Sequence, residues 1–187
     1  AVAQDLAGRG WTVAISGRRA DRLRELALRN SAIRPYPLDV TDSSAVSALV
    51  QQVADDLGRI DLFIFGAAAW STEKTSDYNF AAFAAVTDAN FLGLVRFIEP
   101  LVRQMQRQGG GQIAGIASVA GYFGLPRSAA YSATKAGMIT LLETLRTELK
   151  PSNIDVRMIA PGFVKSDLTA QNDFPMPFLM ETDAAAR

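Results

Sequence analysis

Short apolar runs alternate along this chain with segments in which apolar residues recur every three or four positions. The apolar runs, which predict strands, are residues 11–16, 33–38, 61–65, 112–117 and 154–159. The periodic segments, which predict helices, are residues 1–8, 21–30, the stretch after the capping residues 41–43, 80–107 and 131–149. Strand and helix therefore alternate from one end of the sequence to the other.

The predicted strands are continuously apolar, and they do not alternate apolar with polar positions. Such strands are typical of a parallel sheet that helices cover on both faces. The sequence thus predicts an α/β fold with a doubly wound parallel sheet in three layers, as a single domain over residues 1–187. Pro35 and Pro37 lack backbone N–H groups, so we expect their strand at an edge. Sheets of this kind bind ligands beyond the carboxyl ends of their strands.

The composition excludes several kinds of chemistry. The chain has no Cys and no His, which removes disulfides, Cys and His zinc sites, cysteine nucleophiles and any triad that needs His, and we expect no metal. Lys and Arg number 19, as do Asp and Glu, so no net charge attracts nucleic acid. We see no apolar run long enough to span a bilayer and no signal peptide, which favours a cytoplasmic protein without a membrane partner.

The strongest candidate chemistry is the pair Tyr131 and Lys135. Residues four apart share one face of a helix. A neighbouring ammonium favours the phenolate, so we expect Lys135 to lower the pKa of Tyr131 and to make it a proton donor and acceptor near neutral pH. The alternative is a chance pair on a solvated helix.

Two further polar residues are candidates for the same site. Ser118 follows the strand 112–117, where its hydroxyl could bind a substrate carbonyl; a turn or capping role is the alternative. Asn90 lies inside the helix 80–107, where Asn is unusual unless it has a partner or faces solvent.

Taken together, these residues resemble the classical short-chain dehydrogenase/reductase family. Its catalytic tetrad maps onto Asn90, Ser118, Tyr131 and Lys135. The residues that the resemblance places at the cofactor, besides Tyr131 and Lys135, are Asp39 and Val40 beside the adenine, the small residues Gly66, Ala67 and Ala68, and Pro161, Gly162, Val164 and Ser166 beside the nicotinamide. The resemblance implies a Rossmann-like fold and an NAD(P)-dependent oxidoreductase.

The resemblance also implies a role for each member of the tetrad. Tyr131 would be the general acid in carbonyl reduction, and Ser118 would position the carbonyl oxygen. Lys135 would hold the nicotinamide ribose, and Asn90 would help to hold a water that links Lys135 to solvent. The reaction would interconvert a carbonyl and an alcohol.

The preferred cofactor can be argued from the end of strand 11–16. A carboxylate there would bind the ribose hydroxyls of NAD and repel the 2′-phosphate of NADP. This chain has Gly17 followed by Arg18 and Arg19, and guanidinium groups bind phosphate well. We therefore expect NADP(H) in preference to NAD(H), with Arg18 as the more direct contact. The alternative is that both arginines only begin a charged helix.

The sequence departs from the family at two places. The first Asn of the family's Asn-Asn-Ala-Gly segment is Phe65 here, so the tie that it makes between strands should be missing or come from elsewhere. The family's first strand, its glycine-rich turn and its last strand have no counterpart in the sequence. We expect the absent first strand to belong between the strands 11–16 and 61–65, and the chain to be truncated at both ends.

The segment after Ser166 is apolar and contains two prolines between Phe174 and Met180. A hydrophobic substrate is one explanation; packing on the body of the protein or on a partner subunit is the other. The resemblance implies a homodimer or homotetramer. A non-catalytic nucleotide-binding scaffold or sensor is the alternative function, and the complete tetrad argues against it.

Overall fold

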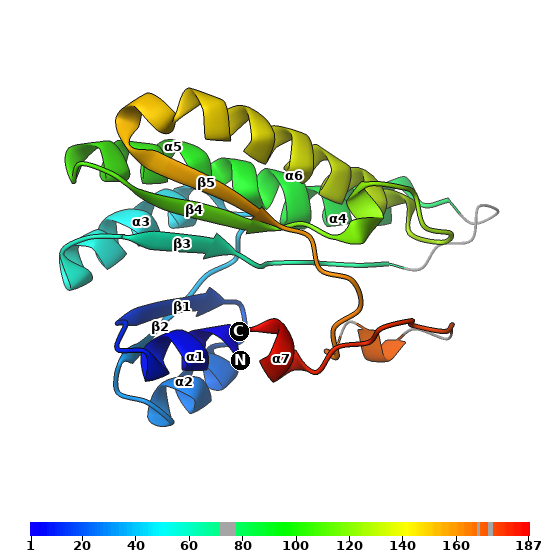
Figure 1. Ribbon diagram of the computed structural model, residues 1–187, viewed down its shortest axis with the longest axis horizontal. Coiled ribbons are helices and arrows are strands. Elements are labelled where there is room, and N and C mark those ends of the chain that lie inside the picture. The colour runs from blue at the N-terminus through cyan, green and yellow to red at the C-terminus, as the bar shows by residue number, and fades with distance from the viewer. Residues whose placement is uncertain (72–77, 168, 172–173) are drawn as a thin grey trace. The chain divides into compact units, whose positions relative to one another are not determined.

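The computed structural model describes residues 1–71, 78–167, 169–171 and 174–187 (Figure 1). Its contacts divide the chain into two compact units. The first unit contains Ala1–Asp39 and Pro161–Arg187, and the second contains Val40–Ala160. The prediction that residues 1–187 form one domain stays a prediction.

The first unit contains a two-stranded parallel sheet. Helix α1 (Val2–Gly8) leads into β1 (Val13–Gly17), and α2 (Ala20–Leu28) leads into β2 (Ile33–Pro37). Among the described residues, β2 pairs with β1 alone, which agrees with the edge position expected from its two prolines. The short helix α7 (Thr182–Ala185) follows a bridge between Val164 and Met180.

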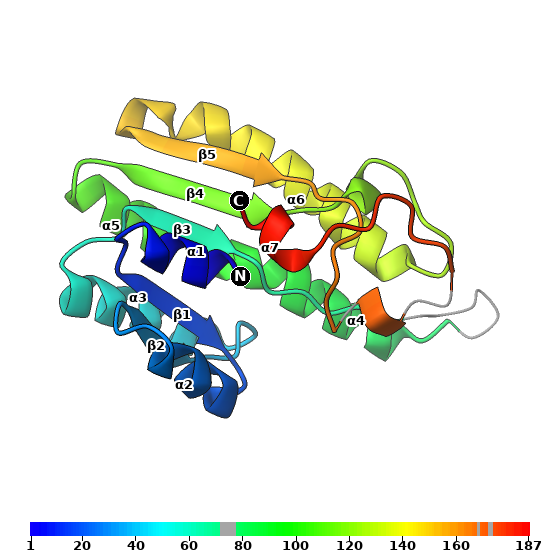
Figure 2. The ribbon, with the colours of Figure 1, turned by 60° about the horizontal axis from the view of Figure 1, so that its bottom comes forward.

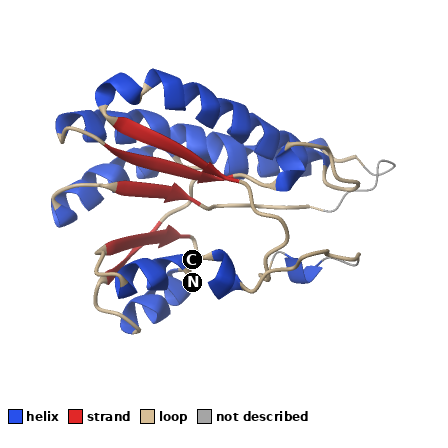
Figure 3. Ribbon diagram, viewed as in Figure 1, coloured by secondary structure: helices blue, strands red, loops and turns tan. Residues whose placement is uncertain are grey.

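The second unit contains the parallel sheet β3-β4-β5, formed by Leu62–Phe65, Gly111–Ile116 and Ile154–Ile159. Three helices lie on the same face of this sheet: α3 (Ser43–Leu57), α5 (Gly93–Arg107) and α6 (Ala129–Glu148) (Figures 1 and 2). Helix α4 (Phe80–Thr87) precedes α5. Strands and helices thus alternate as predicted (Figure 3), and the boundaries differ from the expected ones by up to two residues in most elements.

All ladders in both sheets are parallel, so the predicted α/β class with parallel strands is confirmed. Among the described residues, the strands form two separate sheets, β1-β2 and β3-β4-β5. The apolar faces of the helices form the core of the second unit. Its most deeply buried members are Val46, Leu94, Leu101, Met105, Ile113, Met138, Leu142 and Val156, all fully buried.

The helix 80–107 corrects one expectation. It continues from α4 through one π-helical turn, Asp88–Leu92, into α5. By length and composition these 28 residues could span a membrane, although no single run of the sequence looked long enough. The core helix of a soluble protein meets the same criteria. Leu94, Leu101 and Met105 are fully buried, whereas Phe80, Leu92 and Val95 are exposed, and 28% of the apolar window is buried.

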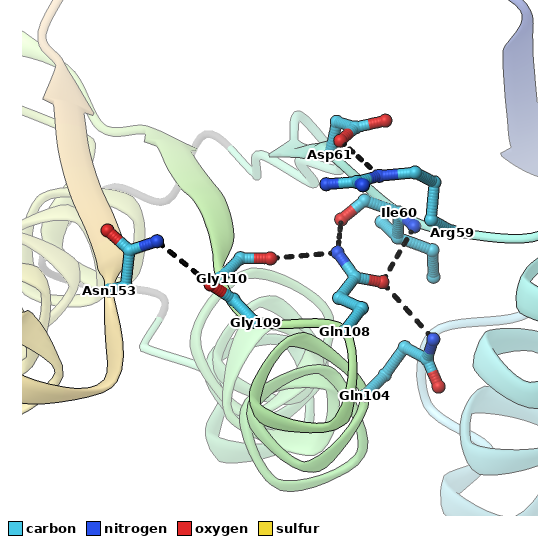
Figure 4. A network of polar contacts seen from close by, with 8 residues as sticks. All are labelled: Arg59, Ile60, Asp61, Gln104, Gln108, Gly109, Gly110 and Asn153. Carbon is cyan, nitrogen blue, oxygen red and sulfur yellow. Dashed lines mark hydrogen bonds and ion pairs between the residues drawn. The ribbon is translucent and has the colours of Figure 1, made fainter.

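A polar network holds the amino ends of β3 and β4 together, and Gln108 is its centre (Figure 4). Its Nε2 donates to the carbonyl oxygens of Ile60, at 2.7 Å, and Gly110, at 2.9 Å. Its Oε1 accepts from Ile60 N at 3.1 Å and from Gln104 Nε2 at 3.2 Å. The end of α5 is therefore bonded to the segments that begin both strands, at the edge of the sheet opposite to the carboxyl ends.

Candidate active site

Ser118 lies two residues beyond the carboxyl end of β4, and it caps the short 3-10 turn Val119–Gly121. Its backbone is extended, and its Oγ accepts a hydrogen bond from Ala120 N at 3.2 Å. The capping role that was the alternative for Ser118 is therefore real. It does not exclude a second role, because the hydroxyl also bonds to Tyr131.

Tyr131 lies in the first turn of α6 and is half-buried. Burial raises the pKa of its phenol, and the hydrogen bond with the Ser118 side chain opposes that rise. We expected Lys135 to bring the pKa of Tyr131 below its ordinary value, and that direction is wrong, because the pKa is raised. The loss of hydration around the phenolate outweighs the favourable interactions, so the phenol keeps its proton at neutral pH.

Lys135 is 2% exposed, one helical turn after Tyr131. Its Nζ donates to Ile116 O at 2.6 Å and lies 5.5 Å from the centroid of the Tyr131 ring. Burial lowers the pKa of Lys135 from 10.5 to about 8. Among the described residues, Ile116 O is its one oxygen acceptor; the other polar contact is Met138 Sδ at 3.7 Å. Two of the three ammonium donors therefore have partners among the described residues, and one is left for another partner.

Asn90 is fully buried in the π-helical turn. Its Oδ1 accepts from Ala69 N at 2.6 Å, and its Nδ2 donates to Ala69 O at 2.9 Å and to Thr134 Oγ1 at 3.3 Å. It does not face solvent, which was the alternative. Thr134 Oγ1 also donates to Tyr131 O at 2.7 Å, so Asn90 reaches the backbone of the tyrosine through one hydroxyl.

The predicted cofactor residues of the second unit lie around the end of β3 and the start of α5. Gly66 leaves room, because a Cβ there would meet only Ile116 Cδ1 at 3.4 Å. Val40 O accepts from Arg96 Nη1 at 3.4 Å. Phe65, which replaces the family Asn, is 2% exposed and packs against Phe97. Its ring makes no polar tie, and the segment after β3 is held instead by the amide of Asn90 at Ala69.

The first unit brings two predicted cofactor segments together. Gly17 ends β1, and its carbonyl accepts from Leu38 N at 3.0 Å. Asp167, directly after Ser166, lies 3.0 Å from Arg22 and 3.8 Å from Arg19. The start of α2 is thus linked to the segment that contains Pro161, Gly162, Val164 and Ser166. Arg18 is exposed and makes no ion pair among the described residues, and Asp39 is exposed next to Val40.

Sequence reasoning missed the residues that fix this arrangement. Thr134 looked like an ordinary position of α6, and Trp70 and Arg96 carried no motif. Arg96 bonds to Ser43 Oγ at 3.0 Å, to Asp88 O at 3.2 Å and to Asp88 Oδ1 at 2.6 Å. The sequence offered one signal for Arg96, which is a charged residue at the boundary of an apolar helix face.

Comparisons with known proteins identify the family. A model of the short chain dehydrogenase family matches residues 1–175. An uncharacterized oxidoreductase of Myxococcus xanthus is 38% identical over 186 residues, which cover 96% of this chain and 73% of the relative. One of Staphylococcus haemolyticus is 32% identical, covering 93% and 76%. The crystal structure of a short-chain type dehydrogenase/reductase from Mycobacterium marinum matches with a TM-score of 0.85 at 28% identity, covering 90% and 69%. The chain therefore belongs to the short-chain dehydrogenase family and is an oxidoreductase.

The described residues fit the NAD(P)(H) cofactor that this family uses. The ammonium of Lys135 is buried but incompletely hydrogen-bonded, as a group that binds ribose hydroxyls would be. Gly66, just after the carboxyl end of β3, has no side chain, and a Cβ there would meet Ile116 Cδ1 at 3.4 Å, so a cofactor can approach the backbone closely.

Proposed function

We propose that this protein interconverts a carbonyl and an alcohol with NADP(H), and that Tyr131 is its general acid and base. The observation that carries the proposal is the arrangement of three residues in the second unit. The Tyr131 phenol bonds to Ser118, and the ammonium of Lys135 lies over its ring. A protonated phenol beside a hydroxyl and a buried cation can transfer a proton to an oxygen that gains negative charge.

Each group has a distinct part in the reduction. A bound nicotinamide cofactor supplies the hydride. Tyr131 donates its proton to the carbonyl oxygen, and its raised pKa keeps that proton available at neutral pH. Ser118 holds the same oxygen in place through its hydroxyl. Lys135 Nζ, which has a donor left beside its bond to Ile116 O, would hold the ribose of the bound cofactor.

Asn90 supports the site by holding the loop after β3. Its amide bonds to both backbone groups of Ala69, and through Thr134 it reaches the backbone of Tyr131. We propose that Asn90 also helps to hold a water that links Lys135 to solvent.

The test is a panel of aliphatic and aromatic ketones, aldehydes and alcohols. NADPH oxidation would be followed by absorbance, and NADPH binding would be measured separately by fluorescence. Turnover of at least one carbonyl is the expected result. Tight NADPH binding without turnover of any member of the panel would refute the proposal and favour a nucleotide-binding scaffold or sensor.

The preference for NADP(H) rests on Arg18. It is exposed and free of ion pairs within the described residues, whereas Arg19 lies near Asp167. Removing a guanidinium that binds the 2′-phosphate should raise KM for NADPH and leave KM for NADH unchanged. Arg18→Ala should show this split, and Arg34→Ala, an exposed arginine on β2, is the control. A wild-type preference for NADH would refute this part of the proposal alone.

The proposal includes a hydrophobic substrate, a cytoplasmic location and a homodimer or homotetramer. Phe174 packs against Phe163 with ring centroids 6.0 Å apart, whereas Phe178 is 97% exposed. The segment therefore contains both a packed and an unpacked aromatic ring, and the second is available to a substrate or a partner subunit.

A further inference from the structure

Trp70 lies in the loop after β3, at the same end of the sheet as Ser118. β3 ends at Phe65, which is paired in register with Gly115 of β4. Trp70 comes five residues after the end of β3, and Ser118 two residues after the end of β4. Because parallel neighbouring strands end at one edge, both loops leave the sheet on the side where such folds bind their ligands.

The position of Trp70 is fixed from both sides. The residue before it, Ala69, is bonded through both backbone groups to Asn90, at 2.6 and 2.9 Å. Its own indole Nε1 donates to Ser128 Oγ at 3.2 Å. Ser128 is the N-cap residue of α6 and is 7% exposed. The tryptophan therefore connects the loop after β3 to the start of the helix that carries Tyr131.

The same turn of α6 holds both Trp70 and the reacting group. Ser128 lies three residues before Tyr131, close to one helical turn. Because the indole N–H of Trp70 is bonded to Ser128, the exposed part of this half-buried ring can make only apolar contacts with a ligand. Tyr122 and Phe123, 59% and 61% exposed, follow the turn that Ser118 caps and add apolar surface there.

We infer that Trp70 is a specificity-determining residue whose indole forms one wall of the substrate site and selects carbonyl compounds with an apolar, preferably aromatic, substituent. The inference rests on the proposed function, and it adds the substrate class that this site would favour. An aryl group would pack on the indole while its carbonyl oxygen reached Ser118 and Tyr131. A small aliphatic ketone would reach the same two hydroxyls without touching the indole.

The experiment compares an aryl methyl ketone with acetone in steady-state kinetics. Trp70→Ala should lower kcat/KM for the aryl ketone about ten-fold, chiefly through KM, and change that for acetone by less than about two-fold. KM for NADPH should not change. Trp70→Phe, which keeps a ring, should recover most of the aryl preference. Ser128→Ala, which removes only the hydrogen-bond acceptor, should have an intermediate effect.

The control is Trp11→Ala, the other tryptophan of the chain, which is 41% exposed and belongs to the first unit. It should leave the ratio of the two ketones unchanged. Equal losses for both ketones in Trp70→Ala would mean a structural role and would overturn this inference alone. A wild-type protein that reduces neither ketone nor any other carbonyl would overturn the proposed function, and the inference would fall with it.

Discussion

Replacing Lys135 by Met should make the ligand-free protein more stable, although it should destroy the enzyme. The ammonium is 2% exposed and has one oxygen acceptor among the described residues. Burial lowers its pKa from 10.5 to about 8, which corresponds to about 3 kcal/mol of unfavourable free energy at neutral pH. Met fills a similar volume without a charge, and it loses the bond from the ammonium to Ile116 O, which contributes about 1.5–3 kcal/mol. A net gain of up to about 2 kcal/mol is expected.

The difference in stability between the wild type and Lys135→Met should depend on pH. Between pH 8 and 10.5 the unfolded chain keeps a proton on Lys135 that the folded chain has released, so the stability of the wild type rises with pH in this window. From pH 7 to 9.5 the wild type should gain about 2 kcal/mol relative to Lys135→Met. The ring of Tyr131 lies 5.5 Å from Lys135 Nζ, and burial raises the pKa of its phenol, so the phenol is protonated at pH 7.

Urea unfolding of the ligand-free protein at both pH values measures the two effects. Lys150→Met is the matched control, because Lys150 is exposed. It should change neither the stability at pH 7 nor its pH dependence by more than about 0.5 kcal/mol. The reasoning is refuted if Lys135→Met unfolds more easily than the wild type at pH 7, or if the two proteins have parallel pH profiles.

Three further substitutions test the contacts around the site. Gly121→Ala should lower the free energy of unfolding by about 1–3 kcal/mol and lower kcat, because a Cβ would lie 2.7 Å from Ile139 Cδ1 and 2.8 Å from the Lys135 carbonyl carbon. Gly124→Ala is the control, because a Cβ there would meet nothing within 4 Å. Urea unfolding and steady-state kinetics should show no change in this control. Gln108→Ala should cost about 1–3 kcal/mol by urea unfolding with kcat unchanged, because its bonds lie at the opposite edge of the sheet, and Gln51→Ala, exposed on α3, is its control. Arg96→Lys should cost about 1–3 kcal/mol and reduce kcat, because an ammonium cannot make all four bonds of the guanidinium to Ser43, Val40 and Asp88; unchanged thermal unfolding would contradict this.

The sequence was sufficient for the parallel α/β class, because apolar periodicity and strand composition depend on local residues. It also identified Ser118, Tyr131 and Lys135 as candidate site residues, because these three residues lie within 18 positions of one another in the sequence. It could not predict the π-helical turn around Asn90. That turn is stabilised by the contacts of Arg96 to segments far apart in the chain.

The pKa of Tyr131 was predicted in the wrong direction for a related reason. The distance of one helical turn to Lys135 was visible in the sequence, but the degree of burial was not. Desolvation depends on all the elements packed around the phenol, and here it outweighs the hydrogen bond with Ser118. The hydrogen bond from Ala69 N to Asn90 Oδ1 likewise joins residues 21 positions apart, and no short motif reveals such a contact.

The kinetics of Tyr131→Phe test the central proposal most directly. The substitution removes one hydroxyl and leaves the ring under Lys135 in place. With NADPH and a carbonyl that the wild type reduces, kcat should fall by about 10²–10⁴-fold, and the Kd for NADPH measured by fluorescence titration should stay within about two-fold of the wild type. Turnover within ten-fold of the wild type, with NADPH bound equally well, would contradict the assignment of proton transfer to Tyr131.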